Sequence, residues 1–332
     1  MASVRHAPIC TRMTDPVSLD AMLAPVAGTR ATGRIEGDRA SIVVDVSGLD
    51  EAERDSLEAN VRAFAGGLPG VATVRVALTS QRSQRLSIAV ASGKGGVGKS
   101  TVSANLAIGL AARGRRVGLV DADIYGPSQP KLMGVEDAKP TARNKVLQPV
   151  PTPFGVPMLS MGMLVAADQA IAWRGPMAAG ALQQMLDANW GEADTLVLDL
   201  PPGTGDVQLT MIQKYRPQGA VIVSTPQDLA LIDAKRAIDL FVKAGIPIIG
   251  LVENMAGYVC PSCGEVSDPF GSGGAEAAAL ALGIPFLGRI PLDMAVRISS
   301  DAGQPSVAGD GPEAVAFGAV ADKVAVWIGA QR

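Results

Sequence analysis

The feature that most constrains the fold is a glycine-rich run at residues 93–101, which reads Gly-Lys-Gly-Gly-Val-Gly-Lys-Ser-Thr. It fits the phosphate-loop pattern Gly-x4-Gly-Lys-Ser, in which backbone N–H groups surround nucleotide phosphates, Lys99 reaches the outer phosphates and Ser100 ligates Mg2+. A buried strand expected over Leu86–Ala91 and a helix over Thr101–Arg113 flank the run, which argues against a chance match in a coil loop. The predicted nucleotide-binding residues of the loop are Gly93, Lys94, Gly95, Gly96, Val97, Gly98, Lys99, Ser100 and Thr101.

The loop contains a second lysine, Lys94, where an ordinary phosphate loop needs only Lys99. An additional cation adds charge repulsion unless further phosphate charge lies nearby. The nucleotide of a partner subunit would supply that charge, in the way that a finger residue donated in trans stabilises the transition state. The alternative interpretation is a solvated surface lysine. The first interpretation makes Lys94 a catalytic residue, together with Lys99, in a homodimer.

Composition limits the remaining chemistry. The chain has 332 residues, is 48% hydrophobic and has a mean hydropathy of +0.25, which suits about two soluble domains. Its single histidine, His6, excludes a Ser-His-Asp triad and a histidine metal site from the body of the protein. The balance of 29 basic and 32 acidic residues predicts no nucleic-acid surface. Three cysteines and no long apolar stretch predict a reducing, cytoplasmic location and no membrane contact.

Two domains are expected. Residues 1–14 form a flexible leader, for which a transit peptide is the weaker alternative; residues 15–80 form a small α+β domain, and residues 81–85 a linker. Residues 86–332 form a P-loop ATPase domain. Within the small domain we expect an apolar periodic stretch, a strand, a helix and a second strand at Val17–Leu23, Ser41–Val46, Glu51–Phe64 and Val71–Leu78.

The larger domain alternates continuous apolar runs with helical stretches. This rhythm predicts an α/β fold with a doubly wound, mainly parallel sheet, whose ligands bind beyond the carboxyl ends of the strands. Packed helices are expected at Gly274–Leu282 and Gly311–Arg332. The further strands are expected at Val117–Val120, Leu196–Leu200, Ala220–Ser224, Ile246–Val252 and Pro285–Ile290.

Carboxylates end two of these strands. Asp121 and Asp123 follow one apolar run, and with no histidine available we expect Asp123 to orient or deprotonate the attacking water. Asp121 is expected to support it and to be one of the nucleotide-binding residues. The alternative is that one of them only caps a turn. Asp199 ends another run, where it is expected to hold the Mg2+ shell. The Pro-Pro-Gly-Thr-Gly segment at residues 201–205 is expected to be a switch and otherwise a plain turn.

Cys260 and Cys263 form a Cys-x-x-Cys pair after a strand. Zinc or an iron-sulfur cluster normally takes four protein ligands, so the pair is half of a site, and Cys10 in the leader cannot readily complete it. A symmetric dimer could complete it with the same two residues from each chain. A redox-active dithiol and an inert reduced pair are the alternatives.

Taken together, these residues resemble the Mrp/ApbC-type iron-sulfur cluster carrier ATPases, a branch of the deviant Walker A class. The resemblance covers residues 86 to about 305, and the class motif runs from Lys94 to Thr101. Residues 15–80 look like the small MIP18-like domain often fused ahead of bacterial members, although Val46–Asp50 lacks the cysteine common there. The runs similar to the branch are Asp121–Ser128, Trp173–Pro176, Asp199–Asp206, Val252–Met255, Cys260–Cys263 and Gly288–Asp293.

The resemblance implies an ATP-hydrolysing homodimer in which Lys94 reaches across the interface. Cys260 and Cys263 of both chains would bridge a 4Fe-4S cluster, Asn254 would contact adenine, and the cluster would pass between scaffold proteins and recipient apoproteins. ATP is expected because the Asn-Lys-x-Asp run of guanine-specific relatives is absent. A MinD/ParA-like positioning ATPase and a zinc-stapled dimeric ATPase switch without cluster cargo remain as alternatives.

Overall fold

The computed structural model describes residues 18–46, 49, 51–79, 85–124, 126–164 and 175–331. The chain divides into two compact units, Met1–Ser83 and Gln84–Arg332. None of the helices in the described ranges is long and apolar enough to cross a membrane.

The N-terminal unit is a three-stranded sheet in the order β1-β2-β3 with two helices. β1 and β2 are antiparallel, whereas β2 and β3 are parallel, and Leu23, Ile42 and Val61 lie in the shared core. The expected strands and helix are confirmed, but β1 escaped prediction because most of its residues are exposed and it lacks an alternating apolar pattern. The elements are α1 (Leu19–Ala27), β1 (Ala31–Glu36), β2 (Arg39–Asp45), α2 (Glu51–Gly66) and β3 (Thr73–Thr79).

The C-terminal unit is built on a seven-stranded sheet in the order β14-β11-β10-β4-β9-β5-β8, and every pair in it is parallel. This confirms the predicted α/β fold. Its strands are β4 (Leu86–Ala91), β5 (Val117–Asp121), β8 (Met158–Ser160), β9 (Thr195–Asp199), β10 (Gly219–Ser224), β11 (Ile248–Asn254) and β14 (Phe286–Ile290), with two small hairpins, β6 (Thr141–Arg143) with β7 (Val146–Gln148) and β12 (Tyr258–Val259) with β13 (Val266–Ser267).

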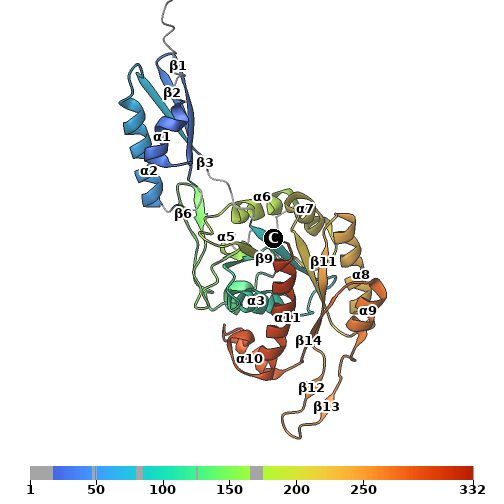
Figure 1. The fold of residues 1–332 in the computed structure, drawn as a ribbon. Helices are drawn as coiled ribbons and strands as arrows, with labels where there is room; N and C mark the ends of the chain where they lie inside the picture. Colours follow the sequence, from blue (N-terminus) through green and yellow to red (C-terminus); the bar gives the residue numbers. More distant parts are fainter. Residues whose placement is uncertain are drawn as a thin grey trace, which may run out of the picture. The chain divides into compact units, whose positions relative to one another are not determined.

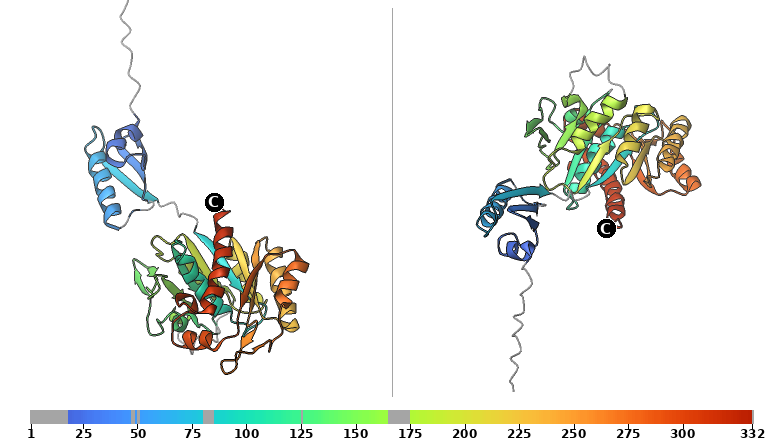
Figure 2. Two further views of the ribbon diagram at one scale, coloured as in Figure 1. Left: turned by 60° about the horizontal axis from the view of Figure 1, so that its bottom comes forward. Right: turned by 90° about the horizontal axis from the view of Figure 1, so that it is seen from above.

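Helices cover both faces of this sheet (Figure 1 and Figure 2). One face packs against α6, α7, α8 and α9, and the other packs against α3 and α11. Because the strands are covered on both sides, they read as continuous apolar runs, which made them recognisable in the sequence. β8 was missed because it is only three residues long. The helices are α3 (Lys99–Ala111), α4 (Gln129–Leu132), α5 (Met161–Leu164), α6 (Gly175–Leu186), α7 (Asp206–Tyr215), α8 (Asp228–Lys243), α9 (Gly274–Leu282), α10 (Met294–Asp301) and α11 (Pro312–Gly329).

Candidate functional site

The glycine-rich loop joins β4 to the N-terminus of α3, as the sequence predicted. Gly98 precedes the helix with a φ of 79°, in the left-handed region that glycine adopts readily. A Cβ atom at Gly98 would lie 2.1 Å from Asn254 Nδ2, and one at Gly93 would lie 1.9 Å from the carbonyl oxygen of Asp233. The glycines therefore let the loop pack closely against the end of β11 and against α8, which fits a backbone cradle for phosphates.

A cleft of about 510 Å³ opens over this loop. Residues beyond β14 and on α10, among them Leu292 and Val296, form its other wall. Gly93, Val97, Asp121 and Asp199 do not line the cleft, although all four were predicted to bind the nucleotide or Mg2+. The predicted residues that do line it are Lys94, Gly95, Gly96, Gly98, Lys99, Ser100, Thr101, Asp123 and Asn254.

Lys99 is held in place by carboxylates. Its side chain is 6% exposed, and its ammonium group donates a hydrogen bond of 2.5 Å to Asp199 Oδ1 and lies 4.0 Å from Asp123 Oδ2. Asp199 is fully buried and also accepts hydrogen bonds from Ser103 Oγ at 2.9 Å and Gln129 Nε2 at 2.8 Å. In this state both oxygens of Asp199 have protein partners. A direct contribution of Asp199 to Mg2+ binding stays a prediction. The contacts in the structure give Asp199 a different role, which is to position Lys99.

Gln129 is a central residue that sequence reasoning missed. Its Nε2 donates both to Asp199 and to the carbonyl oxygen of Ser100, at 2.9 Å, while its buried Oε1 has no hydrogen-bond partner among the described residues. It lies on the short helix α4, one residue beyond the quoted run Asp121–Ser128. A glutamine in a short polar segment carries no sequence signal of such a role.

The two aspartates after β5 have separate surroundings. Asp121 is fully buried and accepts hydrogen bonds from Ser160 Oγ at 2.9 Å and from the backbone N–H groups of Asp123 and Gln129. Burial, reinforced by the nearby charge of Asp199, raises the pKa of Asp121 to about 8. Asp123 lines the cleft. The arrangement agrees with Asp121 as a support for the segment that carries Asp123.

Lys94 lies at the mouth of the cleft with an exposed side chain. It forms no ion pair with another residue in the described part of the chain. Its carbonyl oxygen accepts a hydrogen bond from Ser92 Oγ, and the Ser92 carbonyl accepts one from the N–H of Gly203 at 3.0 Å. The loop that presents Lys94 is thus tied to the predicted switch segment.

The end of β11 connects the nucleotide cleft to the start of α9. Asn254 Nδ2 donates a hydrogen bond of 2.8 Å to the carbonyl oxygen of Val97 in the phosphate loop. The preceding residue, Glu253, is fully buried and accepts hydrogen bonds from the N–H groups of Gly273 and Ala275, where α9 begins, and from Arg289 Nε. Glu253 lies within the run Val252–Met255, and the local sequence does not indicate this role.

The two cysteines lie at the tip of the hairpin of β12 and β13, which projects from the unit (Figure 1). The N–H of Cys260 donates to the Glu265 carbonyl at 2.9 Å, and the N–H of Gly264 donates to the Cys260 carbonyl at 2.8 Å. Backbone N–H groups of Ser262 and Cys263 hydrogen-bond to the Cys260 sulfur and lower the pKa of its thiol. Within the described ranges no third histidine, cysteine or carboxylate joins the pair, so one chain offers half of a metal site.

The root of this hairpin is part of the cleft wall. The N–H of Ala256 donates to the Ile290 carbonyl at 3.0 Å, and the N–H of Leu292 donates to the Gly257 carbonyl at 2.9 Å. Met255 and Leu292 both line the cleft. The backbone that carries the thiols therefore begins where the cleft ends.

Comparison with known proteins agrees with this geometry. Residues 84–325 match the ParA family, described as the NUBPL iron-transfer P-loop NTPases. The chain belongs to this family. An iron-sulfur cluster carrier protein of Deinococcus radiodurans is 48% identical over 287 residues, which cover 86% of this chain and 77% of the relative.

Two solved structures extend the comparison of this P-loop NTPase. A nucleotide-binding protein of Archaeoglobus fulgidus, in complex with ADP, is 43% identical with a TM-score of 0.59, covering 66% of this chain and 87% of that one. The septum site-determining protein MinD of Pyrococcus horikoshii, complexed with Mg-ADP, is 26% identical with a TM-score of 0.56, covering 74% and 98%. Nucleotide binding with Mg2+ at the phosphate loop follows from family and geometry together.

Three predicted features fall outside the described residues: Cys10, the first half of the run Trp173–Pro176, and residues 47, 48 and 50, which lie where related small domains have a cysteine. The MIP18-like identity of residues 15–80 stays a prediction.

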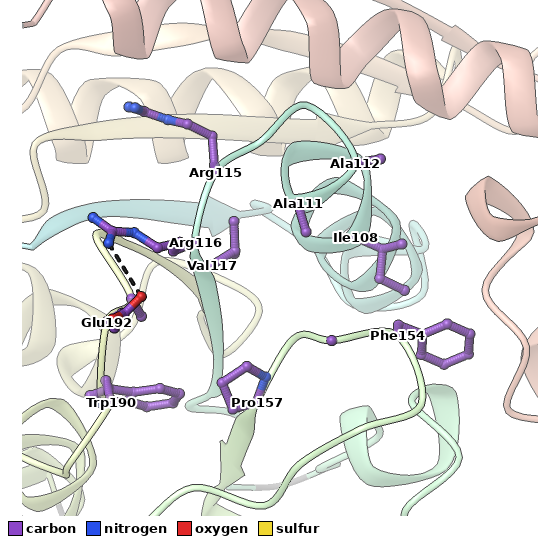
Figure 3. A pocket seen from close by; sticks show the side chains of 12 residues that line it. Ile108, Ala111, Ala112, Arg115, Arg116, Val117, Phe154, Pro157, Trp190 and Glu192 are labelled. Carbon is purple, nitrogen blue, oxygen red and sulfur yellow. Dashed lines mark hydrogen bonds and ion pairs between the residues drawn. The ribbon is translucent and has the colours of Figure 1, made fainter. Parts of the chain in front are cut away.

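A second cleft, of about 520 Å³, lies at the amino end of β5 (Figure 3). Ile108, Phe154 and Trp190 give it apolar walls, and Arg116 pairs with Glu192 at 3.5 Å beside it. No residue predicted for the nucleotide or the metal lines this cleft.

Proposed function

We propose that this NTPase is an ATP-dependent carrier of iron-sulfur clusters. The observation that carries the proposal is the cysteine hairpin rooted in the wall of the nucleotide cleft. The name of the Deinococcus radiodurans relative, an iron-sulfur cluster carrier protein, supports the same cargo. The alternative of a positioning ATPase has no comparable support: α11 has Lys323 as its single cation and buries Phe317 and Val324 in the core, although Val315 and Val326 are exposed.

Within the cleft, backbone N–H groups of the loop and Lys99 bind the phosphates. The residues fit a nucleotide because the glycines form a cradle and because Asp199 holds Lys99 in place at the start of α3. Ser100 lines the cleft and would hold Mg2+, with Asp199 behind it; when bound, Mg2+ neutralises charge that develops on the phosphates. Asp123 orients or deprotonates the attacking water.

The cluster is cargo held by two chains. Two thiols from each of two copies give the four ligands that a 4Fe-4S cluster takes. The lowered pKa of the Cys260 thiol favours the thiolate, which is the form that binds iron. Lys94 contributes to hydrolysis only when the partner's nucleotide is close, so the same homodimer completes both sites. Recipient apoproteins and assembly scaffolds are the partners that this cargo requires, in the cytoplasm.

Anaerobic reconstitution with iron and sulfide tests the proposal. Wild-type protein is expected to take up one 4Fe-4S cluster per two chains, measured by visible absorbance and by iron and sulfide content. A Cys260→Ala, Cys263→Ala variant should take up none and keep its ATPase activity, whereas Lys99→Ala should lose the activity. Normal loading of the double variant would refute the cluster site. Zinc in place of iron in anaerobically purified protein would favour the zinc-stapled switch.

A further inference from the structure

Gln129 carries a buried acceptor that the chain leaves without a donor. The side chain is fully buried, and its Oε1 has no hydrogen-bond partner among the described residues. Exchanging the amide oxygen and nitrogen would not remove the deficit, because Nε2 faces the Ser100 carbonyl oxygen at 2.9 Å and Asp199 Oδ2 at 2.8 Å, which are both acceptors. A buried acceptor without a donor costs free energy, so a donor from outside the chain is expected at Oε1.

The position of Gln129 indicates which donor fits. Gln129 begins α4, and its amide nitrogen joins Ser100, in the first turn of α3, to Asp199, at the end of β9. These two residues are the ones predicted for the Mg2+ shell. Ser100 lines the nucleotide cleft, and its hydroxyl lies 3.3 Å from Lys99 Nζ. The acceptor without a donor therefore belongs to a side chain that contacts both sides of the predicted metal site.

The neighbouring carboxylate is already occupied by protein donors. Asp199 Oδ1 accepts hydrogen bonds from Lys99 and Ser103, and Asp199 Oδ2 accepts one from Gln129. Mg2+ binds few protein ligands and keeps several water molecules, each of which donates hydrogen bonds. These water molecules need acceptors, and Oε1 of Gln129 is an acceptor that no group in the described ranges uses.

We propose that Gln129 Oε1 accepts a hydrogen bond from a water molecule bound to Mg2+, which makes Gln129 a positioning residue of the nucleotide site. The inference rests on the nucleotide and Mg2+ part of the proposed function and is independent of the iron-sulfur cargo. Through Nε2 the same amide holds Ser100 and Asp199, so one side chain fixes both the predicted metal ligand and the hydration of the metal. Gln129 therefore sets the affinity for Mg2+ and not the affinity for the nucleotide alone.

Isothermal titration calorimetry of the full chain separates these two affinities. ADP is titrated into the protein in EDTA, and Mg2+ is titrated into ADP with the protein in excess. Gln129→Leu removes both polar atoms at similar volume. Ser103→Ala is the matched control, because it is also fully buried and removes a donor to Asp199, at 2.9 Å, without changing Oε1.

The two variants should differ in the metal titration. Gln129→Leu is expected to raise the Mg2+ dissociation constant roughly 10- to 100-fold, as the loss of a residue behind a metal ligand does. Its ADP dissociation constant in EDTA should stay within about twofold of wild type, and the Mg2+ dissociation constant of Ser103→Ala within about threefold. If Gln129→Leu does not fold, as judged by circular dichroism, Gln129→Met repeats the comparison.

The outcomes separate this inference from the proposed function. Unchanged Mg2+ affinity in Gln129→Leu would overturn the inference, and so would equal weakening in Ser103→Ala, which would show that Gln129 only holds Asp199. A wild-type ADP complex that binds no Mg2+ would refute the metal site itself together with the role of Gln129. Failure of the wild type to take up a cluster would refute the cargo and leave the Mg2+ result standing.

Discussion

Replacing Asp121 with asparagine tests the electrostatics beneath the cleft. The carboxyl group is fully buried at the end of β5, within hydrogen-bond distance of Ser160 and of two backbone N–H groups. Its pKa is raised from 3.8 to about 8, first by burial and then by the negative charge of Asp199. At neutral pH the folded protein therefore holds a proton on this side chain that the unfolded chain has released.

This difference sets the sign and the size of the effect. Between pH 3.8 and pH 8 the folded state binds one more proton than the unfolded state, so the free energy of unfolding falls as the pH rises. The slope is about 1.4 kcal/mol per pH unit, and between pH 5 and pH 8 the loss amounts to about 4 kcal/mol. An asparagine side chain cannot titrate, so the Asp121→Asn variant should lack this loss. Other groups that can titrate in this window, such as His6 and the Cys260 thiol, are present in both proteins and therefore cancel in the comparison.

Urea unfolding of nucleotide-free protein at pH 5, 6, 7 and 8 measures the effect. The wild type should lose stability steadily relative to the variant, and the difference between their free energies should change by about 4 kcal/mol over the series. Asp322→Asn is the control: Asp322 is exposed and hydrogen-bonded to Arg113, which lowers the pKa of its carboxyl, so its contribution changes only below this range. Parallel curves for wild type and Asp121→Asn would show that the buried carboxyl is not protonated at neutral pH.

Three other predictions rest on single contacts. Gly98→Ala should lower the free energy of unfolding by at least about 1 kcal/mol more than Gly96→Ala. Both glycines have a left-handed backbone, but only a Cβ at Gly98 would clash with the buried Asn254 amide, at 2.1 Å from its Nδ2. Equal losses of stability in urea unfolding would contradict this. Glu253→Gln should lower the free energy of unfolding by about 2–3 kcal/mol, because it removes a buried charge from three N–H donors. Glu276→Gln changes an exposed partner of the same arginine and should lower it by less than about 1 kcal/mol. Equal stability of the two variants in urea would refute the comparison. Cys260 should be alkylated by iodoacetamide with a pH midpoint below that of an ordinary thiol, read by peptide mass spectrometry, and a midpoint at or above about pH 8.5 would exclude the thiolate assignment.

The parts of this fold that could be predicted are those whose signals are local. The phosphate loop is one contiguous run, and the parallel strands are apolar along their whole length because both faces are covered. β1 and β8 were missed for opposite reasons, since β1 is mostly exposed and β8 is too short for a pattern.

The site residues that could be predicted are those that belong to a motif with known chemistry. The residues that were missed act through contacts between distant parts of the sequence. Lys99 and Asp199 were singled out, but their direct hydrogen bond joins residues 100 positions apart. Gln129 and Glu253 act through contacts of the same kind, with the phosphate loop and with α9, and no local pattern marks them. The refined role of Asp199, as the group that positions Lys99, also depends on packing that only the folded chain defines.

The proposed coupling between nucleotide and cargo has a short physical route. Asn254 is bonded to the phosphate loop through Val97, and Met255 lines the cleft in the left-handed region with a φ of 60°. Two residues later, Gly257 accepts the hydrogen bond from Leu292 on the opposite wall. The hairpin is thus anchored to both walls of the cleft within four residues. Under the proposed function, a nucleotide that shifts either wall would move the root of the hairpin, and a cluster shared by two such hairpins would respond because its four thiol ligands come from both chains. We propose that loading and release are controlled at this root, without any rearrangement of the sheet.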